Sequence, residues 1–221
     1  MIQTMTFHSD PDSAMLDLET MGLGPNAAVI QIGVQLFNWP TGTLVGEGLQ
    51  VDVDLHSSLM LGGEVDGDTV RWWRERGGLK PSGTRIDMRT ALAKVASYLA
   101  RAAGLKRVWA QGPSFDIAIM EGYYSRAGRP APWVFHAARD TRTIYDLARA
   151  EGWQKPKEDT AHTALADCRQ QIGHLTSAAA FLPRPGELEL HRADYNAIQA
   201  AGFDSPGELL AAYRELKERD A

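Results

Sequence analysis

Cysteine, long apolar runs and a secretory leader are all missing or scarce in this sequence. Its single cysteine, Cys168, excludes an intrachain disulfide and fits a reducing compartment. No apolar run approaches the roughly eighteen residues that a membrane-spanning helix requires. Residues 1–15 also lack a basic region followed by an apolar one, which a signal peptide would carry. These absences predict a cytoplasmic protein that does not interact with membranes.

Basic residues are also fewer than acidic ones in this sequence. The 23 Lys and Arg residues face 28 Asp and Glu residues, and the formal net charge is −5. A protein that coats nucleic acid is usually basic, so this balance disfavours a coating role. It leaves open an enzyme whose acidic residues bind metal ions and whose basic residues form one local track. The densest basic stretch contains Arg71, Arg74, Arg76, Lys80 and Arg85.

The pattern of apolar residues predicts an α/β fold. Three strands come first and form an antiparallel meander, the second over 27–37 and the third over 44–55. Helices then alternate with strands at 106–112 and 132–140. The predicted helices cover 68–76, 88–104, 114–128, 141–152 and 161–182. This order predicts a mixed five-stranded sheet, three antiparallel strands followed by parallel ones, with helices on both faces.

A break at 183–187, "PRPGE", divides the chain. We therefore predict one domain over residues 1–182 and a helical extension over 183–221. Within the extension, 204–220 has the spacing of an amphipathic helix.

Two acidic residues, Asp17 and Glu19, lie inside the first apolar strand. Residues two apart on a strand share a face, so their side chains project side by side. Two like charges about 4 Å apart repel by roughly 4 kcal/mol at an effective dielectric of about 20. Such a pair either extends into water or binds a cation.

In open α/β sheets, functional sites form at the carboxyl ends of strands and at the starts of the helices that follow them. Two further acids of this sequence lie at or near such positions. Asp116 comes directly after the strand 106–112, although an acid there also complements a helix dipole. Asp167 lies in the helix 161–182, five residues after His162, and either residue alone fits a solvated position. If the acids converge, oxygen-only ligands suit Mg²⁺ or Mn²⁺.

Together these residues resemble the three motifs of the DEDDh 3′–5′ exonucleases. The first motif is "DLET" at 17–20, the second is Phe115 with Asp116, and the third is His162 with Asp167. That family includes polymerase proofreading domains and RNase T, and it has an RNase H-like fold. Further stretches, such as "TVRWW" at 69–73, resemble the phage-type, exonuclease VIII-like branch.

The resemblance implies a catalytic site with two divalent cations, Mg²⁺ or Mn²⁺. Asp17, Glu19, Asp116 and Asp167 would be the metal ligands, with Asp17 bridging both ions. His162 would act as the general base that removes a proton from the attacking water. The product would be a nucleoside 5′-monophosphate. One departure from the family is Pro113, where many members carry Asn or His.

The resemblance also suggests residues that bind the substrate. Some would line the pocket of the terminal nucleotide, others would stack on a base or ribose, and a basic one would contact phosphate. Ordinary core packing or a solvated charge remains an alternative for the stacking and basic residues. The candidates are Leu18, Thr20, Met21, Phe115, Trp73 and Arg142.

We predict a metal-dependent 3′–5′ exonuclease that acts on single-stranded or frayed DNA ends, with DNA favoured over RNA. Three alternatives remain: an exoribonuclease, which differs in tolerating the 2′-hydroxyl, a phosphodiesterase for small nucleotides, and a catalytically silent nucleic-acid-binding module. A phage-encoded protein would act in the host cytoplasm. Relatives include dimers, so a homodimer remains open.

Overall fold

A mixed β-sheet forms the centre of the structure, a computed structural model that describes residues 10–78, 81–157 and 163–182. Its strands run in the order β3-β2-β1-β5-β6, with β4 also paired to β2. The β1–β2, β2–β3 and β2–β4 pairs are antiparallel, and the β1–β5 and β5–β6 pairs are parallel. The strands are β1 (Ser13–Thr20), β2 (Val29–Asn38), β3 (Thr43–Leu44), β4 (Leu49–Asp52), β5 (Arg107–Ala110) and β6 (Ala138–Asp140).

This sheet confirms the predicted mixed, RNase H-like architecture but contains six strands instead of five. The predicted third strand, 44–55, is divided into β3 and β4. Gly46 lies between them with φ of 64°, a left-handed conformation that interrupts an extended strand. The predicted strand 132–140 is also shorter, because a 3₁₀ helix over Phe135–Ala137 precedes β6.

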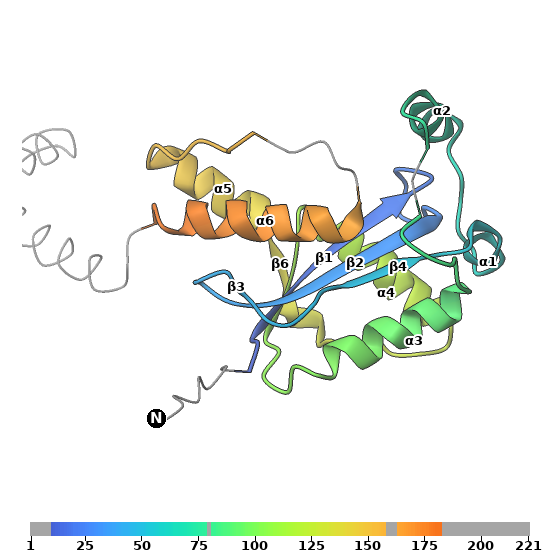
Figure 1. The fold of residues 1–221 in the computed structure, drawn as a ribbon, viewed down its shortest axis with the longest axis horizontal. Helices are drawn as coiled ribbons and strands as arrows, with labels where there is room; N and C mark the ends of the chain where they lie inside the picture. The colour runs from blue at the N-terminus through green and yellow to red at the C-terminus, as the bar shows by residue number, and fades with distance from the viewer. Residues whose placement is uncertain (1–9, 79–80, 158–162, 183–221) are drawn as a thin grey trace, which may run out of the picture. The chain divides into compact units, whose positions relative to one another are not determined.

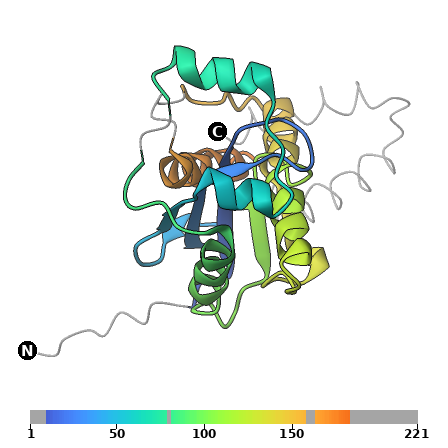
Figure 2. The same cartoon turned by 90° about the vertical axis from the view of Figure 1, so that its right-hand side faces the viewer.

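Helices cover both faces of the sheet, α6 on one side and α3 on the other (Figures 1 and 2). Helix α1 was not predicted from the sequence, because a helix of six residues is too short to show a clear periodicity. The predicted helix at 114–128 begins at Asp116. The helices are α1 (Leu55–Met60), α2 (Gly67–Glu75), α3 (Met88–Leu99), α4 (Asp116–Arg126), α5 (Thr141–Ala150) and α6 (Ala164–Ala179). Within the described ranges, no helix is long and apolar enough to cross a membrane.

The two faces of the sheet differ in polarity. On β1, Leu16 and Leu18 join the apolar core together with residues of α3 and α4. Asp17 alternates with them and therefore points to the opposite face, where its side chain contacts α6. This alternation places the two acids of β1 beneath α6 and its leucines beneath α3 and α4.

Most helices in the described residues begin with an aspartate cap, but the two that carry the candidate acids do not. The side chain of a preceding aspartate accepts a backbone N–H bond at the start of α1, α2, α3 and α5. No side-chain cap bond is present at Phe115 before α4 or at Thr163 before α6. The positions of α4 and α6 therefore depend on contacts with the rest of the fold.

The chain divides into a unit that ends at Phe181 and a second unit over Leu182–Ala221. The predicted extension, 183–221, lies outside the described residues and stays a prediction.

Candidate active site

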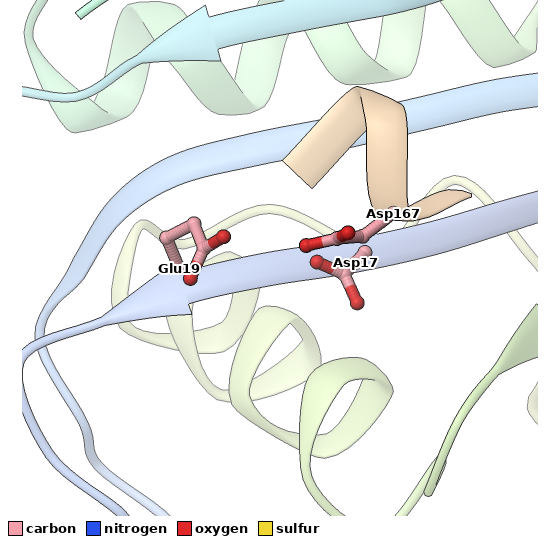
Figure 3. A group of neighbouring side chains, drawn as sticks. All are labelled: Asp17, Glu19 and Asp167. Carbon is pink, nitrogen blue, oxygen red and sulfur yellow. The ribbon is translucent and has the colours of Figure 1, made fainter. Parts of the chain in front are cut away.

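Three carboxylates converge between β1 and α6 (Figure 3). Asp17 and Glu19 come from the second half of β1, and Asp167 comes from the first turn of α6. One oxygen from each carboxylate lies within 4.8 Å of those from the other two, and all three residues are half-buried. The structure therefore brings together acids that are about 150 residues apart in the sequence.

Asp116, the fourth candidate ligand, lies beside this group. It is the first residue of α4 and is buried, with 6% of its surface exposed. Its Oδ1 accepts a hydrogen bond from the backbone N–H of Leu18, at 3.2 Å. Asp116 is not among the acids whose oxygens meet within 4.8 Å. It is nevertheless bonded to the residue between Asp17 and Glu19, at the edge of the same site.

Burial raises the pKa values of Asp17, Glu19 and Asp116, and repulsion between neighbouring acids adds to the rise for the first two. Burial, followed by repulsion from Asp116, Glu19 and Asp167, raises the pKa of Asp17 well above its usual value. Burial and then repulsion from Asp167 and Asp116 raise the pKa of Glu19 to about 7. Burial raises the pKa of Asp116 to about 7, although the bond from Leu18 opposes the rise. A bound cation would favour the ionised forms and relieve this repulsion.

A glycine on β2 allows α6 to come close to the sheet. Gly33 is the register partner of Asp17. A Cβ atom at this position would overlap the backbone carbonyl group of Ala164, the first residue of α6. The missing side chain thus lets the start of α6 rest on β2, which brings Asp167 over the neighbouring strand.

Gln171 is a functional candidate that the sequence analysis missed. It lies one helical turn after Asp167, and its Nε2 donates a hydrogen bond to Oδ1 of Asp17, at 2.7 Å. This bond lowers the pKa of Asp17 and so opposes part of the rise caused by burial. The i+4 spacing from Asp167 was the available signal, because it places both residues on one helix face.

The predicted nucleotide-pocket residues on and after β1 are already engaged within the protein. Leu18 belongs to the core, with its N–H bonded to Asp116. The Thr20 hydroxyl donates to the carbonyl oxygen of Gly22 at 2.7 Å. Met21 is half-buried and bonded through its backbone to two neighbouring loop residues. Substrate contacts at these three positions stay predictions.

The tandem tryptophans of α2 occupy different environments. Trp73 is 7% exposed, and its indole Nε1 donates to the carbonyl oxygen of Thr20 at 2.9 Å. This bond joins α2 to the end of β1, which is a structural role. Trp72 is 36% exposed and carries the guanidinium of Arg76 4.2 Å from its ring centre. Trp72 is therefore the more accessible ring of the pair.

The remaining predicted residues surround the second motif. Phe115 is half-buried and packs against the core immediately before Asp116. Arg142 is exposed at the start of α5, next to Gly112, and its positive charge lowers the pKa of Asp116. His162, the predicted general base, lies outside the described residues, and its role stays a prediction.

A family model of the Rv2179c-like 3′–5′ exoribonuclease domain matches residues 12–179. The chain belongs to this family. The match contains all four acids and His162. Membership confirms the predicted superfamily and the predicted enzyme class, 3′–5′ exonuclease, whereas the phage-type branch stays a prediction. No curated protein matches the chain.

Solved structures of E. coli exonuclease I share the fold. E. coli exonuclease I with a 5cy-dA13 oligonucleotide matches with a TM-score of 0.53 and 15% identity, over 78% of this chain and 41% of that one. The metal-free form of the E. coli exonuclease I–ssDNA complex matches with a TM-score of 0.57 and 14% identity, over 85% of this chain and 44% of that one. The nuclease domain of 3′hExo, a DEDDh family member bound to rAMP, matches with a TM-score of 0.48 and 13% identity, over 78% of this chain and 94% of that one. The chain spans less than half the length of the exonuclease I chains.

Proposed function

We propose that this protein removes nucleotides one at a time from the 3′ ends of single-stranded nucleic acid and releases nucleoside 5′-monophosphates. The convergence of Asp17, Glu19 and Asp167 within 4.8 Å, with Asp116 at its edge, is the observation that carries this proposal. Family membership supports the direction of degradation.

The donor set fits hard divalent cations. All of the candidate ligands are carboxylate oxygens, which suit Mg²⁺ or Mn²⁺ better than softer metals. Cys168, next to Asp167, is buried, and burial raises the pKa of its thiol, so it stays protonated and makes a poor ligand. When bound, two such ions would supply an activated water and stabilise the leaving 3′ oxygen.

Asp17 is the acid we propose as the ligand shared by both ions. One of its oxygens lies within 4.8 Å of those of Glu19 and Asp167, and repulsion from all three other acids raises its pKa. Its carboxylate is also held by the amide of Gln171. The protein thus fixes the orientation of Asp17 by a hydrogen bond on one oxygen.

Groups outside the acids complete the proposed mechanism. We propose His162 as the base that accepts a proton from the attacking water. We also propose that the exposed guanidinium of Arg142, which lies close to Gly112 in the loop before Asp116, contacts a substrate phosphate.

We propose RNA as the first substrate to test, because the family is described as exoribonucleases. The preference for DNA inferred from the sequence stays a prediction, and so do the homodimer and the cytoplasmic location. RNA and DNA differ at the 2′-hydroxyl, which a site can accept or exclude.

One gel assay tests these proposals. Matched 5′-labelled RNA and DNA oligonucleotides are incubated with the enzyme and Mg²⁺, Mn²⁺ or a chelator. We expect a ladder that shortens from the 3′ end, faster for RNA, which disappears with the chelator and with Asp17→Asn.

Other outcomes would overturn parts of this proposal. Faster DNA degradation would restore the sequence-based preference, and internal cleavage would exclude an exonuclease. Binding without cleavage by the wild type would favour the silent module. Rapid hydrolysis of dinucleotides with little activity on longer chains would favour the small-nucleotide phosphodiesterase.

A further inference from the structure

The start of α6 depends on the sheet for its capping. The first N–H groups of a helix have no partner within the helix, and a preceding polar side chain usually supplies one. Thr163 makes no such bond. The partners are instead two glutamines of the sheet: Oε1 of Gln31 accepts from Ala164 N at 2.8 Å, and Oε1 of Gln50 accepts from Leu165 N at 3.3 Å.

These two glutamines flank the place where α6 rests on the sheet. Gln50 on β4 is the register partner of Gly33, the residue whose missing side chain admits Ala164. Gln31 lies two residues before Gly33 on the same strand, opposite Glu19, and is fully buried. The steric contact and both capping bonds therefore act on the same first turn, which contains Asp167.

A buried carboxylate orients the Gln31 amide. Nε2 of Gln31 donates to Oδ1 of Asp52 at 2.6 Å, and Asp52 is 4% exposed. A carboxylate only accepts hydrogen bonds, so the NH₂ end of the amide faces Asp52 and its oxygen faces α6. The other oxygen of Asp52 accepts from the Ser82 N–H, the Ser82 hydroxyl and the Gly83 N–H, each at 2.8 Å.

We propose that Asp52 and Gln31 are positioning residues, which set the place of Asp167 through the start of α6. Hydrogen bonds run from the 82–83 loop through Asp52 and Gln31 to Ala164. The backbone of Asp167 is bonded in turn to Thr163, one turn back. Metal sites require ligands held within about 0.5 Å, so a loosened first turn weakens metal binding. The catalytic consequence rests on the proposed function.

The polarity of the two side chains supplies a direct test. In Asp52→Asn, the NH₂ group of the new asparagine faces Gln31. The Gln31 amide can then direct its oxygen either to this NH₂ group or to the N–H of Ala164, but not to both. Gln31→Glu places two carboxylates against each other. The double variant restores one acceptor and one donor, with a carboxylate at 31 that accepts from both residue 52 and Ala164.

The expected result is a loss in each single variant and a recovery in the double variant. We expect the Kd for Mn²⁺, measured by calorimetry, to rise about tenfold or more in each single variant, as for other residues that orient metal ligands. We expect kcat to fall by a similar factor, KM to change little, and amide hydrogen exchange at Ala164 and Leu165 to accelerate. In the double variant, both the Kd for Mn²⁺ and kcat should return to within about threefold of the wild-type values.

Gln35→Leu is the matched control. Gln35 lies on β2, and its Oε1 accepts from Nε of Arg169, beyond the first turn of α6, so this variant should keep the Mn²⁺ affinity. If a single variant fails to fold, Gln50→Leu, which removes only the cap of Leu165, replaces it.

Unchanged Mn²⁺ affinity and exchange in the folded single variants, or a folded double variant without recovery, would overturn the positioning role. Metal affinity and exchange do not require catalysis. A wild type that binds Mn²⁺ but degrades no oligonucleotide would therefore refute the proposed function while leaving this inference testable.

Discussion

Glu19→Gln should stabilise the metal-free protein at neutral and alkaline pH. The structure raises the pKa of Glu19 from 4.5 to about 7, first by burial and then by repulsion from Asp167 and Asp116. Each pKa unit corresponds to about 1.4 kcal/mol, so the ionised Glu19 destabilises the native state by about 3 kcal/mol. Glutamine has nearly the same shape and carries no charge.

The pH window follows from the two protonation states. Because the pKa is higher in the folded protein, folding favours the protonated form, and the folded state binds more protons between about pH 4.5 and 7. Stability is therefore lost as the pH rises through this window. The difference between the variant and the wild type should be near zero below pH 4.5 and reach its full value above pH 7.

Urea denaturation in EDTA, from pH 4 to pH 8.5, measures this difference. Added Mg²⁺ or Mn²⁺ should reverse the order, because the ion stabilises only the protein that binds it, by RT ln(1 + [M]/Kd). If both proteins keep the same stability difference at every pH in EDTA, Glu19 does not experience the repulsion that the structure implies. If metal stabilises both equally, Glu19 is not a ligand.

Three further substitutions test the geometry around the site. Gly33→Ala should cost about 1–3 kcal/mol in urea denaturation and most of the activity, because the added methyl group displaces α6; native stability would refute the close approach. Gln171→Leu should weaken Mn²⁺ binding about tenfold, since it removes the bond that holds Asp17; an unchanged Kd in calorimetry would contradict this. Trp73→Phe should lower stability by about 1–2 kcal/mol because it removes the hydrogen bond to the Thr20 carbonyl; native stability would contradict the structural role of that bond.

The sequence was sufficient to predict that Asp17, Glu19 and Asp167 belong to one site, but not how the fold brings them together. The two-residue spacing of Asp17 and Glu19 places both on one strand face, because alternation is a local property of strands. The distance between Asp167 and β1 is a tertiary property. It depends on the space above Gly33 and on hydrogen bonds from Gln31, which no local pattern in the sequence reveals.

Other differences have similar causes. Adjacent tryptophans on a helix point in different directions, but only the contact with Thr20 shows that Trp73 is the buried one. Gly46 shortens the third strand by a left-handed turn, although a glycine in an alternating pattern is also compatible with a continuous strand. Gln171 was overlooked because glutamine on a helix is ordinarily a surface residue.

The difference between the two sheet faces should determine how this domain tolerates sequence change. Under α3 and α4 the contacts are apolar and non-directional, so aliphatic residues of similar volume, such as those at Leu16 and Val34, should be interchangeable. Under α6 apolar side chains such as Ile172 are buried too, but Gln31 and Gln171 join the helix to the sheet by hydrogen bonds with a defined donor and acceptor. A change at Gln31 or Asp52 should therefore be tolerated only when the other residue changes so that one still donates and the other still accepts. These two positions should vary together as a pair.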